Sequence, residues 1–417
     1  MSSSPDRQLQ PTPRADRSAV PARRFFPQLE GMRAVAAIAV LTTHVSFQTG
    51  AVNTAVIGPI LGRLDLAVAL FFGLSGFLLW RPWAQAARTG VQSPGEPGRP
   101  PSRGARSIPR PDIGRYFRHR IVRIWPAYVV VVVLVLTLLP DAKGADLTVW
   151  LANLTLTQVF VALSLTAGLT QMWSLSVEVA FYLLLPLIGL ALVRLRGDLA
   201  RLRVPVILAV GVLSLGWAWF AATLPLADGV EPKNWVFGHL PWFVAGLVLA
   251  EIAATTDVAG HHPRWLRITV APSANRPLMA AVFVVAYALA CTPLAGPTGL
   301  GELTHLQFAT KMVLGAIVGY ALLAPLVCAP GPFRFLDSPV MQALGRWSYG
   351  IFIWHLAVLA VVFPLFGIVP FNGDMPLVLA LTVALTIGVS AASYTFIEDP
   401  ARRWINAREA NRTVPNA

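Results

Sequence analysis

Ten long apolar runs, separated by polar stretches, constrain this chain more than any other feature of its sequence. A helix rises about 1.5 Å per residue, so about 20 apolar residues cross the hydrocarbon core of a bilayer, which is about 30 Å thick. Hydrophobic residues make up 55% of the 417 residues and charged residues 13%, whereas about 25% of a soluble domain is charged. We therefore predict an all-α integral membrane protein, a bundle of about ten transmembrane helices. The predicted spans are residues 34–57, 65–80, 121–139, 176–193, 204–224, 236–252, 277–294, 310–329, 344–364 and 376–397.

The distribution of basic residues predicts how these spans are oriented. The formal net charge is +13, and the arginines gather in alternate loops, above all in residues 99–123 and 194–203. The opposite loops hold little more than Arg63, Lys143, Lys233 and Lys311. By the positive-inside rule, both termini are expected in the cytoplasm. Topology and contact with membrane lipids account for the charge, and no soluble basic face indicates nucleic acid as a partner.

Four stretches are not expected to span the membrane. Residues 1–24 are rich in Ser, Pro and Arg and lack the apolar core of a signal peptide, so they predict a disordered basic cytoplasmic tail. Residues 83–112 are rich in Pro and Gly and predict a flexible cytoplasmic loop inside the ten-span domain 25–405. Residues 147–165 are dotted with polar side chains, and counting them as a span would invert the arginine pattern after them, so we expect an external or re-entrant segment. Residues 406–417 are expected to form a cytoplasmic tail.

The first span carries an arginine at its start and a histidine in its middle. His44 follows Arg33 by a distance of about 16 Å along a helix, which places it about halfway through the hydrocarbon core. An ionisable side chain at that depth is costly and is a candidate for function. The alternative is a structural histidine, hydrogen-bonded inside the bundle, and on this helix alone function is only moderately favoured.

Two further arginines lie on the same side of the membrane as Arg33. Arg120 and Arg123 are three residues apart and share a helical face. Guanidinium groups bind phosphate through two parallel hydrogen bonds, so the three arginines predict a site for a phosphorylated ligand. The alternative is positive-inside topology with lipid phosphate contacts, which we adopt for Arg115 and Arg118.

Glu178 begins the fourth span and requires a polar partner inside the membrane. His44 is the natural candidate, because a carboxylate beside an imidazole fixes its tautomer and stabilises its charged form, which suits a general base. The alternative is a carboxylate that only complements the dipole of the helix N-terminus. Neighbouring Trp173 and Ser174 favour a polar site with an aromatic wall.

Two more motifs contribute candidate substrate-binding residues. Ser75 stands between Gly73 and Gly76, glycines that we interpret as a surface for close helix packing, while Ser75 itself can line a cavity. Tyr349 and His355 belong to the ninth span, and His355 is a second histidine at mid-membrane depth. The candidate substrate-binding residues are Ser75, Trp173, Ser174, Tyr349 and His355. The Glu398 motif at the inner interface is interpreted as structural.

Taken together, these motifs resemble the membrane-bound acyltransferase-3 family. The shared residues are Gly31 and Arg33 followed by His44, the Phe71-Phe72-x-x-Ser75-Gly76 run, Arg120-x-x-Arg123-Ile124-x-Pro126-x-Tyr128, Trp173-Ser174-Leu175-Ser176-x-Glu178-x-x-Phe181-Tyr182, Ser348-Tyr349-Gly350 followed by Trp354-His355, and Glu398-x-Pro400. Each motif alone is weakly specific, but together, in this order, they cover nearly all of residues 25–405. Within the family, the chain is most similar to actinobacterial members that acylate trehalose mycolates or macrolide sugars.

The resemblance implies an integral membrane O-acyltransferase in the bacterial cytoplasmic membrane. Acyl-CoA, acetyl-CoA above all, would be the co-substrate, and a hydroxyl of a cell-envelope glycolipid, glycan or glycosylated metabolite the acceptor. Arg33, Arg120 and Arg123 would hold the CoA phosphates. His44, oriented by Glu178, would deprotonate the acceptor hydroxyl or carry the acyl group itself, and the sequence does not separate these roles.

No permanently bound cofactor or metal is expected, since Cys291 and Cys328 form neither a disulfide framework nor a metal-binding pattern. The alternative function is a transporter or flippase for an envelope lipid, with the His and Glu centre as binding site or proton relay. The lack of a visible internal repeat argues against it.

Overall fold

The computed structural model describes residues 26–89, 112–195, 197–257, 263–299, 301–329 and 331–413. Within these ranges the chain is helical and contains no strand. The predicted tail at residues 1–24 and most of the predicted loop at residues 83–112 lie outside the described residues.

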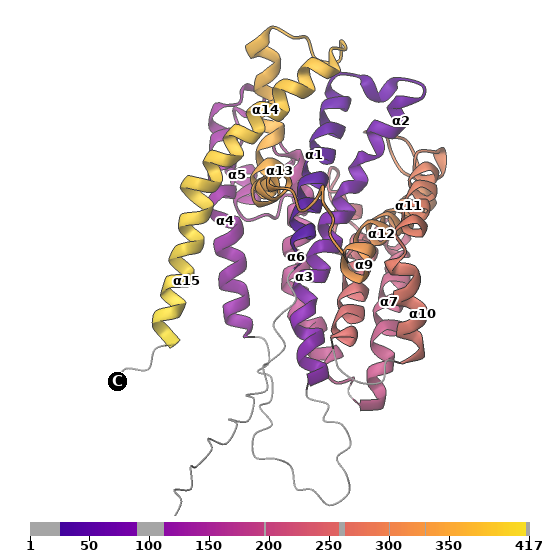
Figure 1. Ribbon diagram of the computed structural model, residues 1–417. Helices are drawn as coiled ribbons and strands as arrows, with labels where there is room; N and C mark the ends of the chain where they lie inside the picture. Colours follow the sequence, from indigo (N-terminus) through magenta and orange to yellow (C-terminus); the bar gives the residue numbers. More distant parts are fainter. Residues whose placement is uncertain are drawn as a thin grey trace, which may run out of the picture.

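Long helices dominate the structure (Figure 1). In chain order they are α1 (Pro27–Gln48), α2 (Ile57–Gly62), α3 (Ala67–Thr89), α4 (Ile113–Leu138), α5 (Leu147–Leu154), α6 (Trp173–Leu192), α7 (Arg203–Ser214), α8 (Trp217–Ala221), α9 (Val236–Thr256), α10 (Arg264–Ala274), α11 (Arg276–Ala290), α12 (His305–Cys328), α13 (Pro339–Phe366), α14 (Met375–Ser393) and α15 (Asp399–Thr413). The 3-10 helices η2 (Arg63–Leu66) and η4 (Thr170–Met172) precede α3 and α6, and the π-helical turn η8 (Tyr394–Glu398) joins α14 to α15.

The predicted all-helical membrane bundle is confirmed. Among the described residues, 8 helical stretches are long and apolar enough to cross a membrane, or 9 if α10 and α11, which bend by 76° at their junction, count as one span. Helix α1, which carries Glu30, Arg33 and His44, is not among these stretches. The orientation of the termini stays a prediction.

Two predicted boundaries are wrong, and one predicted segment has a conformation that the sequence analysis did not address. Helix α1 ends at Gln48 rather than near residue 57, because the chain turns at Gly50 with φ of 75°. Helix α3 continues to Thr89 into the predicted loop, since Trp83 is buried and packs so closely on Gly189 that a side chain there would collide with its ring. The predicted C-terminal tail is helical as far as Thr413.

Residues 147–165 do not form a span, as predicted. Helix α5 has only 8 residues, and turns follow it. The fully buried Asn153 holds this segment together, because its amide donates to the backbone oxygen of Ser164 at 2.9 Å, and the Tyr128 hydroxyl donates to the Asn153 backbone oxygen at 2.6 Å. Hydrogen bonds of this kind satisfy a non-helical backbone that is buried within protein.

Helices α3 and α9 pack closely at the centre of the bundle. A Cβ atom added to Gly246 of α9 would collide with the backbone of Gly73, and one added to Gly76 would lie 2.5 Å from the carbonyl oxygen of Phe243. The interpretation of Gly73 and Gly76 as a close-packing surface is therefore confirmed.

A buried charged cluster ties α3 and α9 to α7. Arg203 donates to Glu251 at 2.7 and 3.0 Å, and the indole nitrogen of Trp80 donates to the same carboxylate at 2.8 Å. All three side chains are at most 1% exposed. Each charge therefore has its counter-charge from the chain itself, as a buried ion pair requires.

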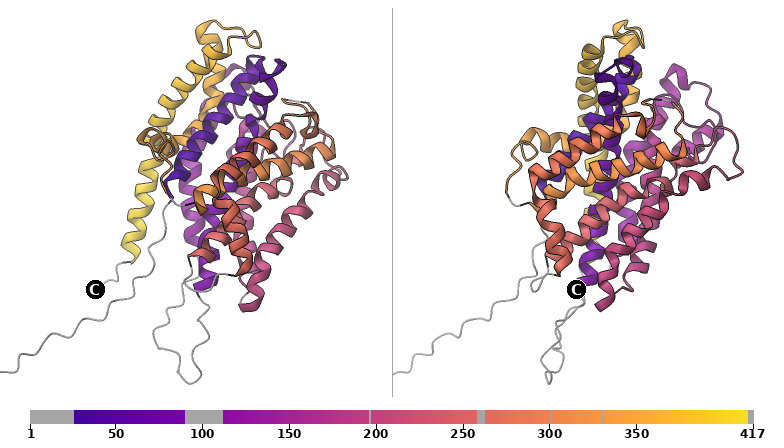
Figure 2. Two further views of the ribbon diagram at one scale, coloured as in Figure 1. Left: turned by 45° about the vertical axis from the view of Figure 1, so that its right-hand side comes forward. Right: turned by 90° about the vertical axis from the view of Figure 1, so that its right-hand side faces the viewer.

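The remaining helices surround this centre. Helix α15 runs alongside α4 at one edge of the bundle, with α7 and α10 at the opposite edge (Figure 1). Glu409 of α15 accepts from Arg115 at 2.7 Å and from His119 at 2.8 Å, which joins the C-terminal helix to α4. In the right-hand view of Figure 2, the orange helices α11 and α12 cross the indigo helices at a steep angle instead of running parallel to them.

Candidate active site

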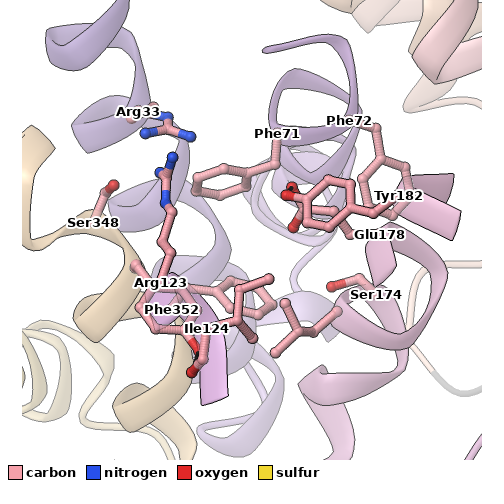
Figure 3. A pocket seen from close by; sticks show the side chains of 12 residues that line it. Arg33, Phe71, Phe72, Arg123, Ile124, Ser174, Glu178, Tyr182, Ser348 and Phe352 are labelled. Atoms are coloured by element: carbon pink, nitrogen blue, oxygen red, sulfur yellow. Dashed lines mark hydrogen bonds between the residues drawn. The ribbon is translucent and has the colours of Figure 1, made fainter. Parts of the chain in front are cut away.

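Five helices enclose a pocket within the bundle (Figure 3). It contains about 550 Å³ of empty space, counting its open side. The pocket combines charged, hydroxyl and aromatic side chains from α1, α3, α4, α6 and α13, as ligand sites between helices of a bundle do. The lining residues are Arg33, Phe71, Phe72, Arg123, Ile124, Ser174, Leu175, Glu178, Tyr182, Ser348, Tyr349 and Phe352.

Two guanidinium groups point toward each other at one end of the pocket (Figure 3). Arg33 comes from α1 and Arg123 from α4. Arg33 has an ion pair with Glu30 at 3.8 Å, one turn away on its own helix, and its buried Nε has no partner among the described residues. Within those residues Arg123 forms no ion pair. Two like charges side by side repel each other, so this end of the pocket suits an anion that both guanidinium groups can bind.

Arg120, the third predicted arginine, does not line the pocket. Its guanidinium lies 5.8 Å from the centre of the Tyr182 ring, on which it stacks. Tyr182 itself lines the pocket, so Arg120 belongs to the layer behind it. The structure thus brings two of the three predicted arginines into the pocket and gives the third a supporting position.

Glu178 faces the other end of the pocket, with Phe71 between it and the two guanidinium groups (Figure 3). Its carboxylate accepts hydrogen bonds from Ser75 of α3 and from Tyr182, one turn further along α6. Ser174 lines the pocket as well, and its hydroxyl donates to the backbone oxygen of Gln171 at 3.2 Å. Ser75, expected to line a cavity, is not part of the pocket lining but bonds to Glu178. The sequence analysis gave Tyr182 no role, although its spacing of four residues from Glu178 was a signal.

Trp173 lies outside the pocket lining. Its ring packs against His239 of α9, with 5.0 Å between the ring centres. Aromatic rings surround His239, among them Trp242 at 5.1 Å, so Trp173 belongs to an aromatic cluster next to the pocket. The sequence analysis did not single out His239, because it lies in an apolar run without a recognisable motif.

The α13 residues divide between the pocket and the layer beyond it. Tyr349 lines the pocket, and its hydroxyl donates to the backbone oxygen of Ile124 at 2.7 Å. Phe352 lines the pocket too, where its ring packs edge-on against Phe71 at 5.8 Å. His355 is not in the lining, but its ring centre lies 6.0 Å from that of Phe352. Phe352 therefore connects the pocket to His355.

His44 packs on His355, with 5.2 Å between the ring centres. The two histidines from α1 and α13 are thus brought together, as a polar centre requires. The expected pairing of His44 with Glu178 is wrong in this structure, because the carboxylate of Glu178 is engaged by Ser75 and Tyr182.

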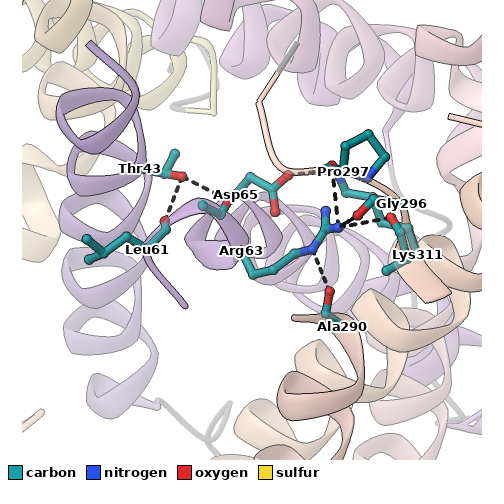
Figure 4. Close-up of polar contacts among 10 residues, drawn as sticks. Thr43, Leu61, Arg63, Asp65, Ala290, Gly296, Pro297 and Lys311 are labelled. Atoms are coloured by element: carbon teal, nitrogen blue, oxygen red, sulfur yellow. Dashed lines mark hydrogen bonds and ion pairs between the residues drawn. The ribbon is translucent and has the colours of Figure 1, made fainter. Parts of the chain in front are cut away.

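Asp65, in η2 just before α3, is a carboxylate whose charge acts on His44. Figure 4 shows the polar contacts around Asp65. Thr43, next to His44, donates to the backbone oxygens of Leu61 and Gly62 at 2.9 and 3.1 Å, and Asp65 pairs with Lys311 of α12 at 2.6 Å. In the sequence, Asp65 stands at the start of the second predicted span, as Glu178 does at the start of the fourth. This position could have identified Asp65 as a candidate.

A buried arginine holds the turn that carries Asp65 in place. Arg63, 1% exposed, donates from one terminal nitrogen to the backbone oxygens of Ala295, Gly296 and Pro297 and from its Nε to that of Ala290 (Figure 4). Arg63 therefore binds the loop after α11 to the turn that carries Asp65. Among the described residues no cluster of His, Cys, Asp and Glu could hold a metal ion, and Cys291 and Cys328 form no disulfide there.

Comparison with known proteins identifies a single domain along the chain. The family model described as an acyltransferase domain matches residues 26–395. The peptidoglycan O-acetyltransferase OatA of Listeria monocytogenes is 22% identical over 91% of this chain and 56% of its own length. The putative peptidoglycan O-acetyltransferase YrhL of Bacillus subtilis is 24% identical over 91% of this chain and 55% of its own length. The chain thus spans about half the length of these two relatives.

A third relative matches from end to end. The acyltransferase MdmB of Streptomyces mycarofaciens is 26% identical over 94% of this chain and 95% of its own length. No solved structure gives a significant match.

Proposed function

Because this chain belongs to the membrane-bound acyltransferase-3 family, we propose that it transfers an acetyl group from cytoplasmic acetyl-CoA to a hydroxyl group of a cell-envelope glycolipid, glycan or glycosylated metabolite. The observation that carries this proposal is the pocket itself. It brings together the guanidinium groups of Arg33 and Arg123, of which Arg123 forms no ion pair within the described chain, and the hydrogen-bonded carboxylate of Glu178 inside a membrane bundle.

The donor would enter with its phosphates at Arg33 and Arg123. Two guanidinium groups offer several N–H donors in a planar fork, which matches phosphate oxygens better than lysine does. The arginine bias of the loops supports the cytoplasm as the side of entry. Arg120 would support the site from behind Tyr182 instead of touching the phosphates.

The reacting group would lie toward the histidines. The thioester of the donor would extend past Phe71 and Phe352, because Phe71 packs on Phe352 and Phe352 lies next to His355. In the reaction, the hydroxyl oxygen bonds to the acyl carbon and the bond from that carbon to the CoA sulfur breaks. His44 would deprotonate the hydroxyl or accept the acyl group first, and both roles remain open at this stage.

The acceptor is proposed from the chemistry of the relatives. Two of those reported are named for O-acetylation of peptidoglycan, and the third, which matches over its full length, is named an acyltransferase. A hydroxyl on an envelope sugar is the group common to the glycan, glycolipid and glycosylated acceptors. The bacterial cytoplasmic membrane gives access to such acceptors on one side and to acetyl-CoA on the other.

The test is comparative mass spectrometry of envelope lipids, glycans and glycosylated metabolites. A deletion strain is complemented with wild type or with His44→Ala. A species that is lighter by one acyl group in the deletion strain, restored by wild type and not by His44→Ala, would establish the transfer and identify the acceptor. An unmodified but mislocalised lipid would contradict acyl transfer and favour a transporter.

A further inference from the structure

His355 is held in one tautomer by its own helix. Its Nδ1 lies 2.7 Å from the backbone oxygen of Phe352 and 3.2 Å from that of Ile351. A carbonyl oxygen can only accept, so Nδ1 must carry the proton. In the neutral ring, Nε2 therefore has a free lone pair.

That lone pair has no partner among the described residues. His355 is 0% exposed, and its Nε2 is a buried atom without a hydrogen bond. A buried polar atom left unpaired costs free energy, so it calls for an explanation. The neighbouring ring is that of His44, with 5.2 Å between the ring centres, and His44 forms no side-chain hydrogen bond among the described residues. An imidazole with a fixed N–H on one side and a free nitrogen on the other is arranged as a proton acceptor.

A second unfilled acceptor, from η4, packs against the same part of α13. Gln171, 2% exposed, donates from its amide nitrogen to the backbone oxygen of Ile353 at 3.1 Å, and its amide oxygen is buried without a partner in the described chain. Ile353 is two residues before His355. Two acceptor atoms that lack donors fit a ligand that brings several O–H groups, such as a sugar.

Few charged or polar side chains from other helices lie near His355. The ring of His44 from α1 packs on His355, and the neutral amide of Gln171 from η4 bonds to the nearby backbone oxygen of Ile353. The carboxylate of Asp65, already paired with Lys311, interacts with His44.

Building on the proposed function, we infer that His355 is the general base of the acyl transfer, and that the acceptor hydroxyl hydrogen-bonds to its Nε2. As the hydroxyl oxygen bonds to the acyl carbon, its proton moves to Nε2, and the bond from that carbon to its carrier breaks. The carrier is the CoA sulfur or a nitrogen of His44. The imidazolium of His355 then gives its proton to the leaving group or to water. No hydrogen bond within the described ranges fixes the tautomer of His44, which is left free to carry the acyl group.

The variant that tests this is His355→Asn. Its amide nitrogen can take the place of Nδ1 and still donate to the Phe352 oxygen, while nothing replaces Nε2. The assay uses membrane vesicles from the deletion strain, which contain the native acceptor, with radiolabelled acetyl-CoA as donor. Alkali-labile label in the envelope fraction is measured against pH and against acetyl-CoA concentration.

We expect the maximal transfer rate of His355→Asn to fall 100-fold or more, because a general base contributes about 10²–10⁴-fold. Its KM for acetyl-CoA should stay within threefold of wild type, since the donor phosphates bind elsewhere. The wild-type rate should rise with pH and level off once the base is unprotonated, whereas the residual rate of the variant should keep rising with hydroxide. A variant that transfers within threefold of the wild-type rate would overturn the inference.

The outcomes separate this inference from the proposed function. If wild-type vesicles transfer no label, the proposed function fails. If wild type and His355→Asn transfer equally, only the role of His355 fails. Should His355→Asn unfold at a lower temperature than wild type, His355→Gly is assayed with and without added imidazole. Recovery of at least tenfold in rate with imidazole would support the base, and no recovery would overturn it.

Discussion

Two polar clusters are buried in this bundle, and they differ in whether the chain satisfies them. Around Glu251, Arg203 and Trp80 supply donors at 2.7–3.0 Å, and all three side chains are closed to solvent. Around the pocket, Arg33 Nε and His355 Nε2 have no partner in the described chain. A membrane protein tolerates a buried charge when it is paired, and an unpaired one is a candidate for function. The first cluster therefore holds helices together, and the second is prepared for a ligand.

The largest effect is expected from breaking the satisfied cluster. Arg203→Leu removes the arginine that donates two hydrogen bonds to the buried Glu251 carboxylate, which should cost about 3–5 kcal/mol of folding free energy. The loss of stability is measured by heating the purified protein in detergent and recording how much of it stays monodisperse. The double variant Arg203→Leu, Glu251→Leu removes both charges and should recover most of the loss. A single variant as stable as wild type would contradict the assignment.

The α3–α9 contact provides the next largest effect. Gly246→Ala places a methyl group against the backbone of Gly73 and should destabilise the protein by about 1–3 kcal/mol, the usual cost of overpacking. Gly388→Ala is the matched control, because nothing lies within 4 Å of a Cβ atom at that position of α14. It should be neutral or stabilising by about 0.5–1 kcal/mol. Equal unfolding temperatures for the two variants would contradict close packing.

A change inside the unsatisfied cluster should affect activity and leave stability alone. Arg33→Lys keeps the charge but loses the planar fork, so kcat/KM for acetyl-CoA should fall about tenfold or more, equivalent to about 1.4 kcal/mol or more. The unfolding temperature should stay that of wild type. The measurement is the initial rate of label transfer in vesicles at varied acetyl-CoA. Unchanged kcat/KM would show that Arg33 does not bind the donor by a bidentate contact.

The smallest effect is expected at the carboxylate of the pocket. Ser75→Ala removes one of the two hydroxyl donors to Glu178. A hydrogen bond to a charged group contributes about 1.5–3 kcal/mol, of which part is recovered by the remaining donor and by water. We expect a loss of stability of at most about 1 kcal/mol, and a loss of transfer rate larger than that of Ser174→Ala. Ser174 bonds to the backbone instead of to the carboxylate, so equal losses would argue against a special role for Ser75.

The sequence predicts the helical membrane fold and much of the pocket, for clear physical reasons. Long apolar runs and arginine bias follow directly from the bilayer, and Gly73 and Gly76 stand where helices touch. Arg33, Arg123 and Glu178 are recognisable because a charge within an apolar run is costly.

Partner choice inside the bundle could not be predicted from the sequence. Glu178 and His44 look complementary in the sequence. In the folded bundle, however, Glu178 accepts hydrogen bonds from Ser75 and Tyr182, and His44 packs against His355. Which helices become neighbours, and at what rotation, depends on contacts between residues that are far apart in the chain. The same holds for Arg120, whose side chain packs behind Tyr182 although its position in the sequence resembles that of Arg123.

The most direct test of the central claim is CoA binding to the purified protein in lipid nanodiscs, measured by calorimetry for wild type, Arg33→Ala, Arg123→Ala and Arg267→Ala. Arg267 is an exposed arginine of α10 outside the pocket. Our account predicts that each pocket variant weakens CoA binding at least tenfold and that Arg267→Ala binds as wild type does. Equal binding by all four proteins would contradict a donor site at the two guanidinium groups.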